Sequence, residues 1–366
     1  MTHGSEYTQR NRTDRPIRSL TAIDLFCGSG AVTSGLKEAG FRVLAAVDVD
    51  DVACQTYRMN HPEVKLLHGD IADLDPAVLK KCVMGELDLL AICAPCQPFS
   101  TQNRKRFGSD ERAQLLLMTI PIIETLLPRA IFVENVPGLG KTEVLPNFKS
   151  ALQRLGYTPN DPVVINAVDL GVPQRRKRTI MFACRDGSVA PVDFAKLSRG
   201  KSTSVRDWIS DLPPPPIGRP PSCVDPLHIA RKHAPITLER LKHVPKNGGR
   251  RSDIPEALQL KCHRGLDRGE FPDTYGRLAW DEPAPTITTG CTDLTRGRFA
   301  HPEEDRAITA REAACLQTFN RDYRFAGNLQ QIATQIGNTV PPLMMKALAE
   351  PIATALGAAR EPMHTE

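Results

Sequence analysis

The first half of the chain alternates short apolar runs with longer amphipathic stretches. The apolar runs predict strands over residues 20–26, 42–48, 64–68, 87–93, 130–134 and 179–184. Between them, helical periodicity predicts helices over residues 31–39, 51–59, 76–82 and 111–126, with Gly40 and Gly156 placed as C-caps. Strands separated by helices of this length favour an α/β fold: a doubly wound, mostly parallel sheet with helices on both faces.

The pattern changes after about residue 190. Residues 211–221 read DLPPPPIGRPP, a stiff connector that is neither helix nor central strand. From there to about residue 300, Gly, Pro, Arg and His abound and periodicity is weak, which indicates a second, smaller, loop-rich domain. Helical periodicity returns at residues 310–316 and 342–356, and the segment 335–342, QIGNTVPP, is predicted to be a polar turn before the last helix.

Composition narrows the class of protein. No run approaches the roughly 18 consecutive apolar residues of a membrane span, and residues 1–20 lack the apolar core of a secretion signal. Ten cysteines at irregular spacings are typical of reduced thiols, so we expect a cytoplasmic protein.

The net charge of +5 resides in one segment. Residues 225–269 hold ten Lys/Arg against five Asp/Glu, whereas the rest of the chain carries equal numbers of each sign. Such a segment is an electrostatic footprint for nucleic acid, but a solvated basic surface is an equally good interpretation of composition alone.

A glycine-rich segment and two acidic residues indicate a cofactor. Residues 24–30, DLFCGSG, follow a predicted strand and begin a helix, where a backbone can approach a ligand closely. Thr33 stands where a dinucleotide fingerprint needs its third glycine, so NAD and FAD fit poorly. Asp48 and Asp70 end the next two strands, and Asp48 is placed where a carboxylate meets ribose hydroxyls. Together these residues predict a nucleoside-containing cofactor.

Cys93 and Cys96, in the sequence CAPC, allow two interpretations. One is a thiol–disulfide oxidoreductase, and the other is a lone nucleophile at Cys96 with Cys93 packed in the core. A zinc site would need a second Cys/His pair at short spacing, which the sequence lacks, so we expect no metal. Glu134 ends a strand at the same sheet edge and favours the nucleophile, because a carboxylate beside a thiol suits acid–base chemistry.

In this order the segments resemble the cytosine-5 DNA methyltransferase family of the bacterial and phage type. The resemblance rests on DLFCGSG (24–30), Asp48, GDI (69–71), APCQPFS (94–100), ENV (134–136), QRRKR (174–178), RAITAREAACLQTF (306–319) and QIGNTVPP (335–342). It implies a Rossmann-like catalytic and S-adenosylmethionine-binding domain in two pieces, a target-recognition domain and a hinge. We expect a flexible tail over 1–18, the catalytic domain over 19–190 and 334–366, the recognition domain over 191–305 and the hinge over 306–333.

The activity implied by the resemblance is DNA (cytosine-5-)-methyltransferase. A cytosine would be flipped out of double-stranded DNA, and the Cys96 thiolate would add to its C6. Glu134 would bond N3 and the exocyclic amine, and Arg176 and Arg178 would contact the O2 edge or hold the loop that bears Cys96. C5 would then take the methyl group of S-adenosylmethionine before Cys96 is eliminated. Asn135 would fix the turn at Pro95 and not touch substrate.

The resemblance also implies two sets of binding residues and a monomer. The cofactor would contact Phe26, Gly28, Ser29, Gly30, Asp48, Val49, Asp70, Ile71, Pro95, Asn338 and Val340. The DNA would contact Gln97, Ser100, Arg104, Lys105, Arg106, Arg250 and Arg251.

The sequence leaves two alternative functions open. The same chemistry on tRNA is one, but the Cys-Phe-Thr signature of the RNA-acting branch is missing and the recognition segment is large and basic. A non-catalytic, sequence-specific DNA-binding regulator is the other, and it would not require Cys96. The enzyme would serve as the modification partner of a restriction system or as an orphan methylase.

Overall fold

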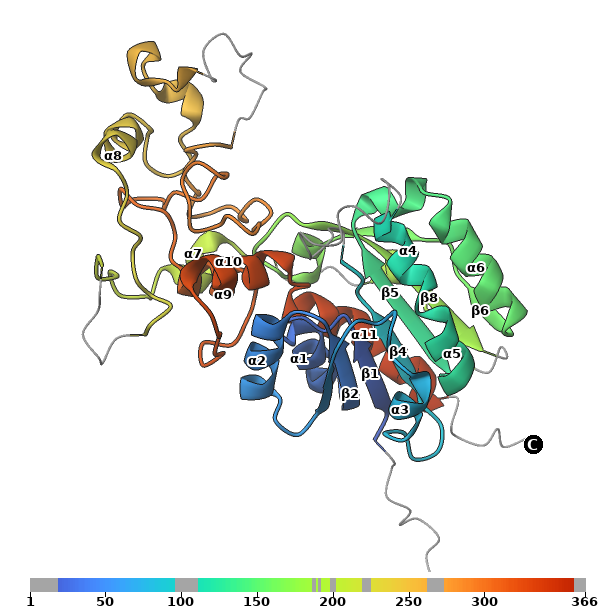
Figure 1. Ribbon diagram of the computed structural model, residues 1–366. Coiled ribbons are helices and arrows are strands. Elements are labelled where there is room, and N and C mark those ends of the chain that lie inside the picture. The colour runs from blue at the N-terminus through green and yellow to red at the C-terminus, as the bar shows by residue number, and fades with distance from the viewer. Residues whose placement is uncertain are drawn as a thin grey trace, which may run out of the picture.

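The computed structural model describes residues 19–95, 111–185, 189, 192–197, 202–218, 225–261 and 273–358. These residues form a larger lobe built on a sheet and a smaller lobe of loops and short helices, which lies at the upper left of Figure 1. The two lobes agree with the predicted division into a scaffold and a loop-rich insertion, although the predicted domain boundaries themselves stay predictions.

The described residues form a sheet of eight strands in the order β3-β2-β1-β4-β5-β8-β6, and β7 also pairs with β8. The pairings among β1 to β5 are parallel, whereas β8 runs antiparallel to β5, β6 and β7. The strands are β1 (Thr21–Leu25), β2 (Arg42–Asp48), β3 (Lys65–His68), β4 (Leu89–Ile92), β5 (Ala130–Asn135), β6 (Tyr157–Pro159), β7 (Val163–Asn166) and β8 (Lys177–Arg185). This confirms the mostly parallel, doubly wound sheet. The strands β6 and β7 were not predicted: β6 has three residues and ends on a proline, and β7 has only partly buried or exposed residues apart from Ile165, so neither forms a buried apolar run like β4.

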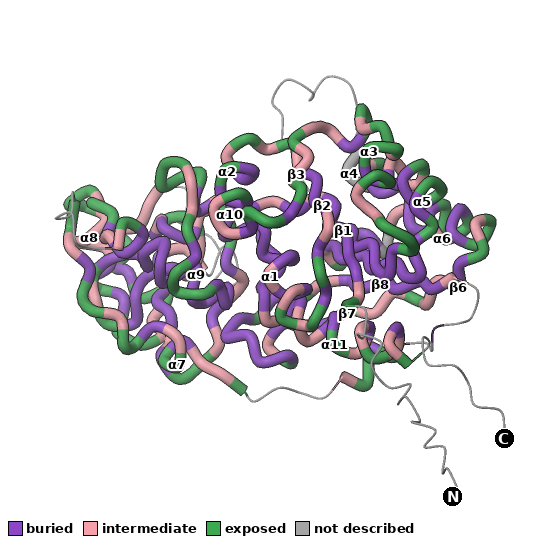
Figure 2. Tube along the Cα trace, turned by 90° about the horizontal axis from the view of Figure 1, so that it is seen from below, coloured by how far each residue is buried: buried purple, intermediate pink, exposed green. Residues whose placement is uncertain are grey.

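Helices cover both faces of the sheet. On one face lie α1 (Ala31–Glu38), α2 (Asp51–Asn60) and α11 (Pro342–Ala358), and on the other α3 (Pro76–Lys80), α4 (Glu111–Leu117), α5 (Ile120–Leu126) and α6 (Val144–Arg154). Successive strand residues alternate between the two apolar cores, so Ala22 packs toward α11 and Ile23 toward α5. Figure 2 shows the strands buried between these layers.

Two sequence predictions are wrong. The single helix expected over 111–126 is two helices, because Pro121 has no N–H to donate to the preceding turn and therefore begins a new helix. The turn expected over 335–342 is wrong in its first half, because residues up to Asn338 belong to α10 (Leu329–Asn338). The reciprocal capping of Asn328 and Gln331 marks the start of α10 and is the signal that could have found it.

The smaller lobe shares its core with helices that follow it in sequence. It contains α7 (Val205–Ile209) and α8 (Pro235–Lys242), and α9 (Ala310–Leu316) packs with α7 and α10 around Leu278 and Ile287. Among the described residues there are also short 3-10 helices: η1 (Pro137–Lys141), η2 (Ala167–Leu170), η3 (Phe194–Lys196), η4 (Arg251–Asp253) and η5 (Glu256–Leu258). Within the described residues, no helix is long and apolar enough to span a membrane.

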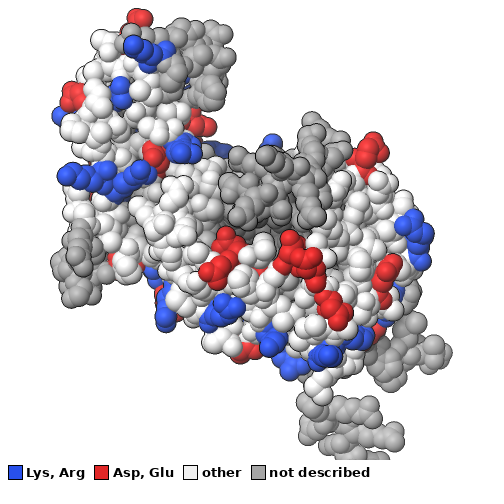
Figure 3. Space-filling model, viewed as in Figure 1, with Lys and Arg blue, Asp and Glu red and all other residues white. Residues whose placement is uncertain are grey.

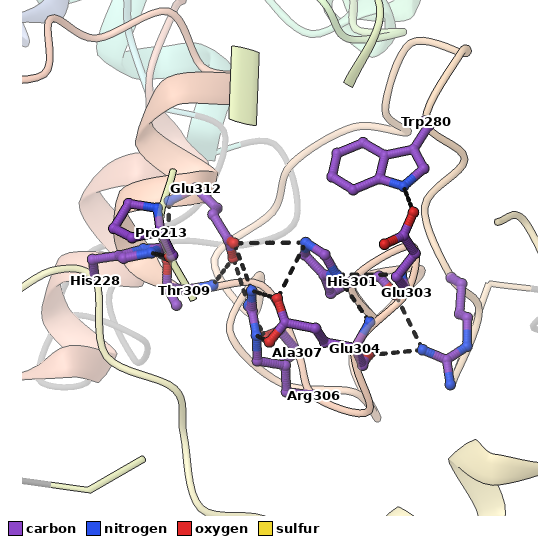
Figure 4. Close-up of polar contacts among 11 residues, drawn as sticks. Pro213, His228, Trp280, His301, Glu303, Glu304, Arg306, Ala307, Thr309 and Glu312 are labelled. Atoms are coloured by element: carbon purple, nitrogen blue, oxygen red, sulfur yellow. Dashed lines mark hydrogen bonds and ion pairs between the residues drawn. The ribbon is translucent and has the colours of Figure 1, made fainter. Parts of the chain in front are cut away.

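A buried ion network ties the smaller lobe to α9 (Figure 4). Arg306 makes paired hydrogen bonds to Glu312, at 2.7 and 2.8 Å, and a second pair to Glu304, at 3.0 and 2.9 Å. Glu312 also accepts from the backbone N–H of Thr309, which caps α9. His301 lies beside both carboxylates, and its Nδ1 accepts from the backbone N–H of Glu304. The start of α9 is therefore held by charge-assisted bonds and not only by apolar packing.

Candidate active site

A cavity of about 970 Å³ lies at the carboxyl ends of β1, β2, β4 and β5. The strand order reverses between β1 and β4, and ligands of open α/β sheets bind at such a switch point. Most of the predicted catalytic and cofactor residues line the cavity, namely Phe26, Gly28, Ser29, Asp48, Val49, Asp70, Ile71, Pro95, Glu134, Arg176, Arg178, Asn338 and Val340. Residues scattered over more than 300 positions thus meet at one place.

The loop between β1 and α1 has an unusual backbone. Phe26, Gly28 and Gly30 all have positive φ, at 61°, 52° and 95°. Phe26 carries a side chain in this left-handed region, where only glycine is free of strain. The loop is held by bonds from Cys27 N to Val47 O and from Gly28 N to the Asp48 carboxylate, at 3.0 and 2.7 Å.

Gly30 does not line the cavity. A Cβ atom at Gly30 would lie 2.5 Å from the ring of His61 and 2.9 Å from the hydroxyl of Tyr323, so the residue faces these two side chains. The role of Gly30 is therefore to allow close packing behind the loop.

Two carboxyl groups near the loop are desolvated. Burial raises the pKa of Asp48, although hydrogen bonds from the N–H groups of Asp50 and Gly28 partly oppose it. Burial raises the pKa of Asp24 to about 7, against the hydrogen bond that Thr33 donates. Asp70 is half-buried and accepts from the N–H of Ala72.

Glu134 is the next-to-last residue of β5 and lines the cavity. Its side chain is 7% exposed and forms an ion pair with Arg178, with 2.8 Å between Oε1 and Nε. Burial raises the pKa of Glu134 above its ordinary value, and the charges of Arg178 and Arg176 only partly offset this. A raised pKa makes the Glu134 carboxyl group easier to protonate, which suits an exchange of protons with a bound base.

Arg176 has a different environment from Arg178. Its side chain is buried, and it donates to the carbonyl oxygens of Ile287, at 3.0 Å, and Gly337, at 3.1 Å. These bonds join β8 to the smaller lobe and to the end of α10. The contact of Arg176 with the O2 edge or with the loop that bears Cys96 stays a prediction, whereas its bonds to Ile287 and Gly337 connect parts of the fold.

The turn that leads to Cys96 is fixed from β5. Asn135 donates from Nδ2 to the carbonyl of Ala94 at 3.1 Å, in agreement with its predicted role in holding the turn. Burial raises the pKa of Cys93 well above the ordinary value, so this thiol is a poor partner for disulfide exchange. The predicted nucleophile and the residues of the following loop, Cys96, Gln97, Ser100, Arg104, Lys105 and Arg106, lie outside the described residues.

The predicted DNA contacts in the smaller lobe differ in exposure. Arg250 is exposed, whereas Arg251 is 6% exposed and therefore lies below the surface. Figure 3 shows basic side chains on this lobe interspersed with acidic ones. Several cations of the basic segment are paired, for example Arg231 with Asp293. The surface that could meet a polyanion is thus a mixed one with a basic excess.

Sequence reasoning missed part of the cavity wall. Residues 286–289 of the smaller lobe line the cavity, as do Gln330, Gln331, Thr334 and Gln335 of α10. Gln335 donates from Nε2 to the carbonyl of Ala326, while its buried Oε1 has no hydrogen-bond partner among the residues that the structure describes. The polar face of α10 could have been found from the capping signal that starts the helix.

The fold is an α/β fold with a cavity at the switch point between β1 and β4, where open sheets of this kind bind their ligands. A profile of the family described as C-5 cytosine-specific DNA methylase matches residues 20–354. Among curated proteins, the Type II methylase M.HgiDII of Herpetosiphon aurantiacus is 38% identical over 90% of this chain and 94% of its own length. The Type II methyltransferase M1.HphI of Haemophilus parahaemolyticus is 32% identical over 91% and 87%.

Solved structures share the fold. A protein described as a DNA modification methyltransferase encoded within a prophage (E. coli) superposes with a TM-score of 0.73 at 22% identity, covering 92% of this chain and 99% of that one. The Dnmt2 methyltransferase of S. pombe gives 0.64 at 18% identity, covering 92% and 98%. The chain belongs to the C-5 cytosine-specific DNA methylase family and is a DNA (cytosine-5-)-methyltransferase.

Proposed function

We propose that the cavity binds S-adenosylmethionine beside a cytosine flipped out of a specific sequence in double-stranded DNA. The observation that supports this most is the convergence of Asp48, Asp70 and Glu134 on one cavity at the strand ends. The first two suit a nucleoside, and the third suits the polar edge of a pyrimidine.

The cavity fits S-adenosylmethionine on chemical grounds. Asp48 ends β2 and can accept from ribose hydroxyls, while the half-exposed Val49 and the buried Ile71 offer apolar surface to an adenine ring. The unpartnered Oε1 of Gln335 can accept from an ammonium group. When bound, S-adenosylmethionine supplies an electrophilic methyl group.

The residues of the chain would activate the base. We propose that the Cys96 thiolate adds to C6, so that the ring electrons move toward N3 and C5 becomes nucleophilic. Glu134, with its raised pKa, holds a proton at N3 and accepts from the exocyclic amine, and Arg178 keeps its carboxyl group in place. After methyl transfer, the C5 proton is lost to water, and the electrons of that C–H bond form the C5–C6 double bond as the C6–S bond breaks, which restores the aromatic ring and the free Cys96 thiolate.

The smaller lobe is proposed to read the DNA, because it holds the basic segment and also contributes residues 286–289 to the cavity. Arg250 is a better candidate for a phosphate contact than the buried Arg251. We propose that the protein acts as a monomer, as the modification enzyme of a restriction–modification system or as an orphan methylase.

The decisive experiment is methyl transfer with labelled S-adenosylmethionine, followed by bisulfite sequencing of a plasmid from cells that express the protein. We expect 5-methylcytosine at one recurrent sequence and none with Cys96→Ser, because an alcohol is a far poorer nucleophile at neutral pH. Transfer to tRNA but not to DNA would overturn the substrate, and full activity of Cys96→Ser would overturn the mechanism.

A further inference from the structure

The loop 26–30 is held by two side chains, Tyr323 and His61, which the proposed mechanism does not use. Tyr323 donates its hydroxyl to the carbonyl of Ser29 at 2.5 Å. The Nε2 atom of His61 lies 2.9 Å from the carbonyl oxygen of Gly30 and 3.2 Å from the Tyr323 hydroxyl oxygen. Both groups are buried, and both act on successive carbonyls of the loop.

The tautomer of His61 follows from its neighbours. Burial, together with the charge of Lys37, lowers the pKa of His61 to about 4, so the ring is neutral at physiological pH. The Lys37 ammonium group, 2.9 Å from Nδ1, can only donate, so Nδ1 is the acceptor and Nε2 carries the hydrogen. His61 therefore donates from Nε2 to the carbonyl oxygen of Gly30, which can only accept a hydrogen bond.

Tyr323 belongs to a segment that is anchored to α2. Asn60 donates to the carbonyl of Arg324 at 2.8 Å and accepts from its N–H at 3.0 Å, and the N–H of Ala326 donates to the hydroxyl of Thr56 at 2.9 Å. This segment connects α9, which packs in the smaller lobe's core, with α10, which lines the cavity. The loop is thus held by a segment that also contacts both of these parts.

We propose that Tyr323 and His61 are positioning residues that preorganise the loop 26–30 for S-adenosylmethionine. The loop contains three left-handed residues, one of them not glycine, so its conformation needs external support. Without these donors the loop would populate other conformations in the free protein, and the apparent affinity would fall in proportion to the competent fraction. The inference rests on the proposed binding of S-adenosylmethionine.

The test is calorimetric binding of S-adenosylmethionine to the full chain carrying Tyr323→Phe, which removes only the hydroxyl. We expect the Kd to rise about tenfold, a value within the range of one buried hydrogen bond. In methyl-transfer assays, the KM for S-adenosylmethionine should rise while kcat stays within about twofold. Phe325→Leu is the matched control, because Phe325 packs in the same aromatic cluster and makes no bond to the loop.

A second pair of variants tests His61. His61→Gln places an amide N–H near the position of Nε2 and should retain most of the affinity, whereas His61→Leu should lose it. The inference is overturned if Tyr323→Phe binds like the wild type, if Phe325→Leu causes the same loss, or if the Gln and Leu variants are equivalent. If the wild type itself does not bind S-adenosylmethionine, the proposed function fails instead.

Discussion

The buried pair of Arg306 and Glu312 allows a quantitative prediction for Arg306→Leu. The side chain of Glu312 is 2% exposed and receives two hydrogen bonds from Arg306 and one from the N–H of Thr309. Removing the arginine leaves a buried carboxylate with much less compensation, which typically costs about 3–5 kcal/mol. We therefore expect the free energy of unfolding of the smaller lobe to fall by about this amount at pH 7.5.

The loss should depend on pH in a defined direction. Burial alone would raise the pKa of Glu312, but the hydrogen bonds and charge of Arg306 outweigh it, so the pKa lies below its ordinary value. In the wild type, the stabilisation by Glu312 is therefore present above the unfolded-state pKa and is lost as the pH falls through the folded one. In Arg306→Leu, burial dominates and the folded state takes up a proton more easily. The difference between the two proteins should narrow as the pH falls from 7.5 to 5.

Urea unfolding followed by tryptophan fluorescence is a suitable assay, because both tryptophans, Trp208 and Trp280, lie in the smaller lobe. The control is Arg321→Leu, which breaks an exposed pair with Asp211 and should cost less than about 1 kcal/mol. The double variant Arg306→Leu with Glu312→Gln should recover part of the loss, because it removes the uncompensated charge. A double variant no more stable than Arg306→Leu would refute this electrostatic reasoning.

Further predictions concern the active site, the packing and the pH range of the fold. Glu134→Gln should lower kcat by about 10²–10⁴-fold with little change in the Kd for S-adenosylmethionine, because it removes the proton held at N3; an unchanged kcat would exclude this role. Gly337→Ala should destabilise the protein in thermal unfolding, because its Cβ would overlap the backbone of Thr288 and Thr289, whereas Gly69→Ala, whose Cβ would meet no described atom within 4 Å apart from its chain neighbours, should be tolerated. Because the pKa of His61 is lowered to about 4, the folded state resists a proton that the unfolded state binds, so wild-type stability should decline below about pH 6.5, by at most about 1.4 kcal/mol per pH unit. His61→Gln should show a shallower decline in urea titrations over that range. DNA binding should weaken steeply between 50 and 200 mM salt by about 10³-fold or more if six or more phosphates are contacted, and a salt-independent Kd would argue against the basic lobe as the DNA-binding surface.

The parts of the fold that could be predicted from sequence are those whose signal is local. The central strands are buried on both faces and therefore appear as continuous apolar runs, and their order along the chain is enough to place Asp48, Asp70 and Glu134 at one edge. Local signals thus locate the cavity.

The parts that could not be predicted depend on contacts across long sequence separations. Tyr323 bonds a residue 294 positions earlier, and nothing near Tyr323 in the sequence indicates that contact. Arg176 belongs to a family pattern that suggests catalysis, yet its two described guanidinium bonds go to Ile287 and Gly337, 111 and 161 positions later. A pattern shows that a residue type is required, whereas the neighbours that tertiary folding brings to it decide its contacts.

The packing of α11 against α1 has a consequence for synthesis of the chain. The apolar residues Leu36 and Val43 are covered by Met345 and Leu348, which follow about 300 positions later. At ribosomal rates of about 5–20 residues per second, about 15–60 seconds pass between the synthesis of that face of the sheet and the synthesis of α11, which covers it. During this interval the nascent larger lobe presents an open apolar face, so we expect it to be a client of ribosome-associated chaperones until the last helix emerges.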